Sequence, residues 1–273
     1  MTQTDGISTQ PGHYVPVNGL NIYYEECGSG EPLILLHGGG GTCKMWQPHL
    51  SCLVPYFRVI APDSRAHGRT DNPTAELSYR LMADDVAAFI QALDLTNPLV
   101  FGYSDGGQIA LELGMRYPNL AGALVVGAAS CRTPETYHDG LKALGLEGPG
   151  VVNIEQLQRE SPWWADILKT EHARADDPDY WQTLLKQLSV MWWAPLDYTA
   201  EDFRKIAEPT LILLGDRDEL NPLEQSVEMY QLIPNAELAI LPNATHGSAI
   251  FSASSELTMK IVLDFLLRHS TRS

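Results

Sequence analysis

One short segment limits the possible folds of this chain more than any other. The apolar residues 99–101 run into the turn sequence GYSDGG at residues 102–107, and a helical pattern begins at Gln108. A sharp turn from strand to helix strains the backbone at its central residue, so glycines are needed beside it, where a Cβ would collide. Such a turn exposes the hydroxyl of Ser104 at the start of a helix. The segment therefore predicts a nucleophilic serine in an α/β protein; the alternative is a glycine turn that happens to contain a serine.

The rest of the chain repeats the alternation of strands and helices. Short apolar stretches bounded by turn residues predict strands at residues 13–17, 20–26, 32–36, 57–61, 98–103, 121–126, 210–214 and 237–241. The first two alternate in character and are expected to be antiparallel edge strands. Helical patterns occur near residues 80–93, 108–116, 222–233 and 254–268. This order predicts a mostly parallel sheet flanked by helices on both faces.

The alternation stops between residues 131 and 200. This stretch has helical periodicity and contains five of the six tryptophans, Trp163, Trp164, Trp181, Trp192 and Trp193. We expect it to be a helical cap, inserted after the sixth strand into a core made of residues 1–130 and 201–273. Apolar binding sites are usually walled with aromatic side chains, so the predicted substrate-binding residues are Trp163, Trp164, Trp192 and Trp193. In the alternative, the tryptophans only seal the cap against the sheet.

Composition excludes several classes of partner. The chain has 273 residues, of which 44% are hydrophobic, and its formal net charge of -16 repels nucleic acid and anionic lipid. We therefore expect neither a nucleic-acid nor a membrane partner. Residues 1–16 lack the basic and apolar regions of a signal peptide, and the four cysteines show no C-x-x-C spacing. These features predict a cytoplasmic protein with reduced thiols.

Two later segments offer partners for the serine. A serine hydroxyl becomes a good nucleophile only when a base takes its proton and a third group orients that base. Catalytic groups of a parallel sheet gather at the carboxyl ends of its strands, here in the order serine, acid, histidine. The predicted strand 237–241 ends shortly before His246, which is therefore the predicted base. The strand before it ends at a group of acids, and the residues alone leave the acid open among Asp216, Asp218 and Glu219.

With these motifs the chain resembles the α/β-hydrolase superfamily over nearly its whole length. The family pattern G-x-x-D matches residues 215–218. The resemblance implies that Asp218 is the triad acid and that Asp216 is a solvated loop charge. Other members of the family place the acid after the sixth strand, but this chain has only Ala-Ala-Ser at residues 128–130.

The glycine-rich sequence HGGGG at residues 37–41 lacks the spacing of a phosphate-binding loop. It resembles the family's H-G-G loop, which turns backbone N–H groups toward the carbonyl oxygen under attack. The resemblance implies that the N–H of Gly39 or Gly40 joins that of Asp105 in an oxyanion hole. His37 is then a structural residue.

A third loop also resembles the family, at residues 62–70. The family sequence is D-x-R-G-H-G-x-S, and this chain departs from it at Ala66 and Thr70. The resemblance implies a hydrogen-bonded scaffold rather than a catalytic group for Asp63, Arg65 and His67.

Together these features predict a serine hydrolase that cleaves a small ester through an acyl-enzyme, with no metal or organic cofactor. A lactonase or amino-acid ester hydrolase ranks next, then a C–C bond hydrolase, and a non-catalytic receptor of the same fold stays open. The SDGG sequence at residues 104–107 resembles the valacyclovir-hydrolase group, in which the acid after the serine meets the substrate's ammonium. The glycine loop is more similar to that of C–C hydrolases. Asp105 either caps the following helix or binds such an ammonium.

Overall fold

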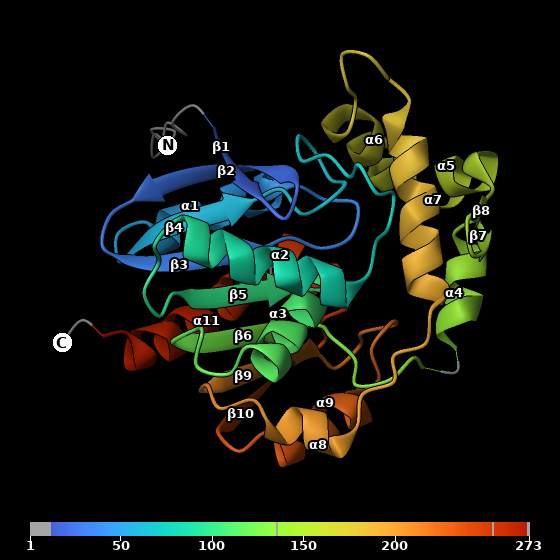
Figure 1. The fold of residues 1–273 in the computed structure, drawn as a ribbon. Helices are drawn as coiled ribbons and strands as arrows, with labels where there is room; N and C mark the ends of the chain where they lie inside the picture. The colour runs from blue at the N-terminus through green and yellow to red at the C-terminus, as the bar shows by residue number, and fades with distance from the viewer. Residues whose placement is uncertain (1–11, 135, 253, 272–273) are drawn as a thin grey trace, which may run out of the picture.

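The central feature of the structure is an eight-stranded sheet (Figure 1). The structure, a computed structural model, describes residues 12–134, 136–252 and 254–271. From one edge to the other the strands are β1 (His13–Val17), β2 (Leu20–Gly28), β4 (Phe57–Pro62), β3 (Glu31–Leu36), β5 (Leu99–Tyr103), β6 (Ala123–Gly127), β9 (Thr210–Gly215) and β10 (Ala236–Leu241). All neighbours from β4 to β10 are parallel, whereas β1 and β2 pair antiparallel. The prediction of a mostly parallel sheet is confirmed. Of the first two strands, however, only β1 is an edge strand, because β2 lies between β1 and β4.

Alternate residues of the strands face two separate hydrophobic clusters. On β3, Ile34 and Leu36 belong to one cluster, while Leu33 and Leu35 belong to the other. The first lies under α2 (Tyr79–Ala92), α3 (Asp105–Arg116) and α9 (Leu223–Leu232), and the second under α1 (Leu50–Leu53), α10 (Ser248–Phe251) and α11 (Ser255–His269). A 3-10 helix, Cys43–His49, precedes α1, and α8 (Ala200–Arg204) precedes β9. Successive side chains of β3 point to opposite faces of the sheet, and both faces are buried. The sequence of β3 is therefore a continuous apolar run.

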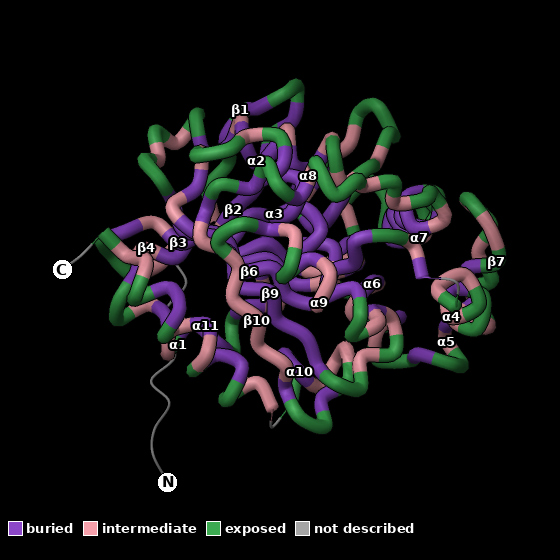
Figure 2. The backbone as a smooth tube through the Cα atoms, turned by 90° about the horizontal axis from the view of Figure 1, so that it is seen from below, coloured by how far each residue is buried: buried purple, intermediate pink, exposed green. Residues whose placement is uncertain are grey.

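Helix α3 lies at the centre of this arrangement. Every residue from Asp105 to Met115 is buried, because α3 packs on β5, β6 and α2. Figure 2 shows the buried backbone gathered along the strands and α3 in the middle of the molecule. The residue that starts α3 is therefore positioned by the most buried part of the fold.

The segment between residues 131 and 200, here called the inserted segment, lies to one side of the sheet (Figure 1). Its elements are α4 (Tyr137–Ala143), β7 (Leu146–Gly148), β8 (Val151–Val152), α5 (Ile154–Glu160), α6 (Pro162–Glu171) and α7 (Tyr180–Trp193). The short β7–β8 hairpin was not expected from its helical pattern. Buried leucines of this segment, such as Leu184 and Leu188, join the same hydrophobic cluster as α2 and α3. That the segment acts as a cap stays a prediction.

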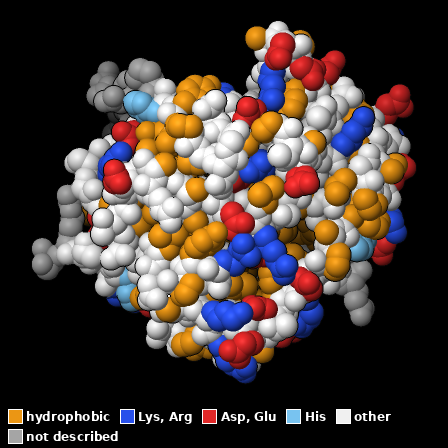
Figure 3. All heavy atoms as spheres, in the orientation of Figure 1, with side chains coloured by type: hydrophobic (Ala, Val, Ile, Leu, Met, Phe, Trp, Pro, Cys, Tyr) orange, Lys and Arg blue, Asp and Glu red, His pale blue; other side chains and the backbone are white. Residues whose placement is uncertain are grey.

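Surface charge is mixed in spite of the large negative net charge. Figure 3 shows acidic and basic side chains scattered over the visible face, with apolar atoms between them. Arg80 of α2 pairs with Asp197 at 3.0 Å and thereby links the core to the inserted segment. No helix in the described part of the chain is long and apolar enough to span a membrane. The four cysteines are free thiols.

Candidate active site

Ser104 stands at the sharp turn between β5 and α3. Its backbone has φ 57 and ψ -120, a conformation that costs free energy for a residue with a side chain. Neighbouring strands enforce it: the Ser104 N–H donates to the Gly127 carbonyl at 2.8 Å. A Cβ on Gly102 would overlap the Gly106 carbonyl, and a Cβ on Gly106 would overlap that of Leu36. The two glycines therefore allow the turn that exposes the Ser104 hydroxyl.

The structure brings Ser104, His246 and Asp218 together. The Ser104 Oγ lies 3.0 Å from His246 Nε2, and His246 Nδ1 lies 2.9 Å from Asp218 Oδ2. Asp218 follows β9 and His246 follows β10, at the carboxyl ends of their strands. The Asp218 side chain is fully buried, and its other oxygen accepts the N–H groups of Leu220 at 2.9 Å and Asn221 at 2.8 Å. These bonds fix the carboxylate toward the imidazole.

The two competing acids are placed differently. Asp216 is on the surface, and its side chain accepts the Ala244 N–H at 3.3 Å. Glu219 accepts the backbone N–H of His246 at 3.1 Å. Of the three adjacent acids, therefore, only Asp218 meets the imidazole ring.

The charges around His246 favour its protonated form. Burial acts to lower the pKa of His246, but the hydrogen bond and charge of Asp218, with the charges of Glu219 and Asp105, outweigh burial. The pKa of His246 is consequently raised above its ordinary value. An imidazole with a raised pKa is a stronger base once it is neutral, and the neutral form is the one that can accept the Ser104 proton.

The glycine loop after β3 offers one free N–H group rather than two. The Gly40 N–H donates to His67 Nε2 at 3.2 Å, so of the two alternatives for the oxyanion donor, Gly39 or Gly40, the Gly40 alternative is corrected. The N–H groups of Gly39 and Asp105 donate to no residue within the described ranges. A Cβ on Gly39 would overlap the Asp105 carboxylate and the Trp192 ring. The loop therefore lies against the start of α3, where these two N–H groups can serve one oxyanion.

Buried histidines and acids hold this loop in place. His67 donates from Nδ1 to the Arg65 carbonyl, which leaves Nε2 free to accept from Gly40. Burial lowers the pKa of His67 well below its ordinary value, so the ring is neutral, as that acceptor role requires. Asp63 accepts the Cys43 N–H at 2.8 Å, and Arg65 pairs with the buried Asp85 at 2.6 Å. These contacts agree with a scaffold role.

Asp105 is enclosed by two donors. Its carboxylate accepts from the Tyr79 hydroxyl at 2.7 Å, and the Trp192 Nε1 lies 3.0 Å from both of its oxygens. Asp105 is the acidic residue in the first turn of α3, where the helix dipole favours a negative charge, so its role as a helix cap stays a prediction. Burial raises the pKa of Asp105 to about 6, although the bonds from Tyr79 and Trp192 act to lower it. Hydrogen bonds from Tyr79 of α2 and Trp192 of α7 thus connect both helices to Asp105 of α3.

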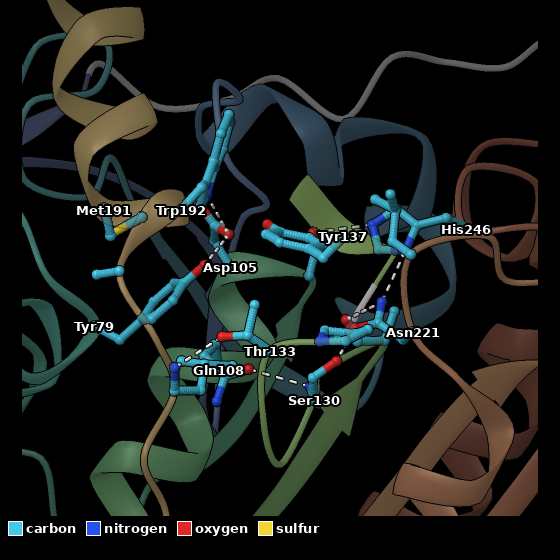
Figure 4. A pocket seen from close by; sticks show the side chains of 16 residues that line it. Tyr79, Asp105, Gln108, Ser130, Thr133, Tyr137, Met191, Trp192, Asn221 and His246 are labelled. Atoms are coloured by element: carbon cyan, nitrogen blue, oxygen red, sulfur yellow. Dashed lines mark hydrogen bonds between the residues drawn. The ribbon is translucent and has the colours of Figure 1, made fainter. Parts of the chain in front are cut away.

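A pocket opens beside Ser104 and His246, between the core and the inserted segment (Figure 4). Tyr79 and Trp192 point toward Asp105 at one side of it, and Asn221 lies beside His246 at the other. The sequence interpretation did not single out the polar lining residues, Tyr79, Gln108, Ser130, Thr133, Tyr137 and Asn221. Of these residues, only Ser130 and Asn221 could have been identified from the sequence, because each follows the end of a parallel strand, where catalytic groups gather.

The four predicted tryptophans have different environments. Trp192 lines the pocket. Trp163 is 60% exposed, and Trp193 stacks on His138 at 4.3 Å and donates to the Leu146 carbonyl. Trp164 lies beside Gly40, 6.0 Å from the Trp192 ring, and is not a lining residue. Of the four candidates, Trp192 therefore lies at the pocket, as expected for at least one of them, and helical faces turn the other three elsewhere; substrate contact stays a prediction.

Asn221 joins the acid to the pocket wall. Its amide Nδ2 donates to Asp218 Oδ1 at 3.3 Å and to the Ala128 carbonyl at 3.1 Å, and lies 3.2 Å from His246 Nδ1. Its Oδ1 accepts from the Ser130 hydroxyl at 2.5 Å. The reverse amide orientation would place Oδ1 against two acceptors, so the hydrogen-bond network fixes this one. No group of three metal-ligating side chains occurs within the described ranges.

A parallel sheet flanked by helices, with a serine at the turn after β5 and an acid and a histidine after later strands, defines a protein of the α/β-hydrolase fold. The family described as alpha/beta hydrolase fold matches residues 31–253. The chain therefore belongs to the alpha/beta hydrolase family, which confirms the family resemblance drawn from the sequence motifs.

Known proteins similar to this chain carry several activities. It is 30% identical over 250 residues to the AB hydrolase superfamily protein YisY of Bacillus subtilis, covering 87% of this chain and 93% of that protein. It is 27% identical to the 2-hydroxy-6-oxo-2,4-heptadienoate hydrolase of Pseudomonas putida, covering 95% and 98%. The solved meta-cleavage product hydrolase of Pseudomonas fluorescens IP01 aligns with a TM-score of 0.76 at 22% identity, covering 95% and 98%.

Proposed function

We propose that this protein is a serine hydrolase that cleaves a small ester through an acyl-enzyme intermediate. The observation that carries the proposal is the unbroken hydrogen-bonded chain from Ser104 Oγ through His246 to the buried Asp218. In the first step the Ser104 oxygen bonds to the ester carbonyl carbon while His246 takes the hydroxyl proton. His246 then gives this proton to the departing alcohol as the C–O bond breaks.

The second step regenerates the enzyme. Water attacks the acyl carbon, His246 takes a proton from it, and the acid leaves as the Ser104 oxygen recovers a proton. Asp218 holds the imidazole and stabilises its positive charge in both steps. The N–H groups of Gly39 and Asp105 bind the oxyanion that forms at each tetrahedral intermediate, which in other hydrolases supplies several kcal/mol of stabilisation.

The Pseudomonas putida relative supports a second candidate, hydrolysis of a dienoate with a carbon leaving group. Such a substrate carries a carboxylate. The described pocket lining has no Lys or Arg and contains Asp105, which opposes a bound anion. This favours the ester over the dienoate.

Turnover of p-nitrophenyl esters of graded acyl length tests the proposal. We expect release of p-nitrophenol by the parent, and a loss of several orders of magnitude in kcat for Ser104→Ala with an unchanged circular dichroism spectrum. Ser51→Ala, which removes an exposed hydroxyl on α1, is the matched control and should keep the parent rate. A parent without turnover, or a Ser104→Ala variant with the parent rate, contradicts the proposal, and ligand binding without turnover would favour a receptor.

A further inference from the structure

Gln108 carries a buried hydrogen-bond donor that the protein does not use. It lies one turn after Ser104 on α3 and is 4% exposed. Its Oε1 accepts the Ser130 N–H at 3.2 Å, which fixes the amide, while its Nε2 is buried without a partner. The Tyr198 hydroxyl lies within reach of this amide, but one hydroxyl oxygen can accept at most one of the two N–H groups on Nε2. A buried donor left unpaired is rare in proteins, and one that lines a pocket calls for a ligand acceptor.

The neighbours of Gln108 in the pocket also offer donors (Figure 4). The Thr133 oxygen accepts the Leu196 N–H at 2.9 Å, so its own hydroxyl proton remains available. The Tyr137 hydroxyl makes no hydrogen bond to any residue that the structure describes, and burial raises the pKa of this phenol, which keeps it protonated. The carboxylate in the lining, Asp105, is already occupied by Tyr79 and Trp192. The described lining therefore has unused donors, and of these the Gln108 amide Nε2, unlike the two hydroxyls, can only donate.

Three kinds of ligand group fit this wall poorly. An alkyl chain would leave the Gln108 donor unpaired, and so would an ammonium group, which donates hydrogen bonds and accepts none. A carboxylate would face Asp105 with no Lys or Arg among the described lining residues. A neutral oxygen, as in an ether, ketone or second ester, accepts a hydrogen bond without bringing a charge.

We propose that Gln108 is a specificity-determining residue, whose Nε2 binds a neutral oxygen acceptor on the substrate a few atoms from the scissile ester bond. This inference rests on the proposed function, since the subsite belongs to the pocket of Ser104. It names the substrate class as small oxygen-bearing esters rather than simple alkyl esters.

Two pairs of isosteric esters test the inference, because each replaces one methylene by an oxygen. The acyl pair is p-nitrophenyl pentanoate and p-nitrophenyl 3-methoxypropanoate, and the alcohol pair is butyl acetate and 2-methoxyethyl acetate. The measured quantity is the ratio of kcat/KM, oxygen ester over carbon ester. Comparing this ratio between the parent and Gln108→Met cancels the different intrinsic reactivities of the esters. We expect Gln108→Met to lower the ratio about tenfold in at least one pair, the value of one neutral hydrogen bond.

Gln225→Met is the matched control. Gln225 is also buried, and its Oε1 accepts the N–H groups of Cys131 and Arg132, in the same loop that Gln108 supports, but it does not line the pocket. It should leave both ratios unchanged. Gln108→Glu keeps an acceptor for the Ser130 N–H while removing the donor, and replaces Gln108→Met if that variant unfolds.

The outcomes separate this inference from the proposed function. Hydrolysis of all four esters with ratios that Gln108→Met leaves unchanged overturns the Gln108 subsite and keeps the serine hydrolase. If the parent cleaves none of them, the proposed function fails, and calorimetric Kd values for butyl acetate and 2-methoxyethyl acetate replace the rates. If the parent binds the oxygen ester more tightly than the carbon ester and Gln108→Met removes this preference, the subsite is still supported. If the ratio of the two Kd values is the same in the parent and in Gln108→Met, the subsite is overturned. An equal fall of the ratio in Gln225→Met shows a loop effect and also overturns it.

Discussion

The side-chain amide of Asn221 donates to Asp218 Oδ1 at 3.3 Å and lies 3.2 Å from His246 Nδ1. Its positive N–H end thus stabilises the carboxylate and opposes a positive imidazolium. Its carbonyl end accepts from Ser130 in the pocket wall. One amide therefore connects the acid, the base and the pocket.

Asn221→Ala should lower kcat roughly tenfold, about the effect of one hydrogen bond to the acid. It should also move the rising limb of the pH profile of kcat/KM to higher pH, because the N–H dipole no longer opposes the imidazolium. Ser130→Ala keeps the Asn221 donor and should leave that limb in place. A lower kcat with no movement of the limb in either variant would show that Asn221 only supports the loop.

Asp218→Asn should be far more damaging than Asp216→Asn. The first change removes the acceptor that holds the imidazole tautomer, and in serine hydrolases such a change costs about 10⁴-fold in kcat. Asp216 is a surface residue that meets a backbone N–H and not the imidazole, so its variant should stay within a few-fold of the parent. Rates on one p-nitrophenyl ester provide the measurement. The reverse order would move the acid to Asp216.

Activity should rise with pH through an apparent pKa above about 6.5, the ordinary value for histidine. The sign follows from the chemistry: the base is the neutral imidazole, and the raised pKa of His246 delays its formation to higher pH. Glu219→Gln removes one of the charges that raise the pKa of His246, while an amide oxygen can still accept the His246 N–H. The rising limb of kcat/KM should therefore shift to lower pH. A shift to higher pH would contradict this assignment of charges.

Much of the fold could be predicted from the sequence because the signals were local. The strand at residues 13–17 and the helix at 80–93 match β1 and α2 to within one residue, since period-2 and 3.6-residue patterns report burial directly. The positions of Ser104, Asp218 and His246 at the ends of strands followed from the same patterns.

The errors arose where the packing of distant segments decides the outcome. Gly40 looks equivalent to Gly39 in the sequence, but His67, 27 residues away, takes its N–H. The orientation of Trp163 and Trp193 depends on how α6 and α7 pack, which the periodicity of either helix alone does not fix. Gln108 resembles any polar residue in an amphipathic helix until the chain around Ser130 encloses it.

Asp105 leads to a prediction about stability, because its buried carboxylate is held in the charged form at neutral pH. Burial raises the pKa of Asp105 to about 6, compared with about 3.9 in an unfolded chain. Between these values the folded state binds the proton more tightly than the unfolded state. Stability therefore falls as pH rises from about 4 to 6, by about 3 kcal/mol in total, and this loss persists above pH 6. Below pH 4 the penalty is absent.

Asp105→Asn removes the charge and keeps an oxygen that can accept from Tyr79 and Trp192. Urea unfolding should show a variant more stable than the parent by about 3 kcal/mol at pH 8 and nearly equal to it at pH 4. Asp85→Asn provides a control of opposite sign, because it leaves the buried Arg65 without its partner and should destabilise the protein at pH 8. If Asp105→Asn is instead less stable at both pH values by the same amount, the two hydrogen bonds outweigh the cost of burying the charge. A gain in stability only at pH 8 would mean that the protein retains this carboxylate beside Ser104 at the expense of stability. Residues of functional sites are often retained at such a cost.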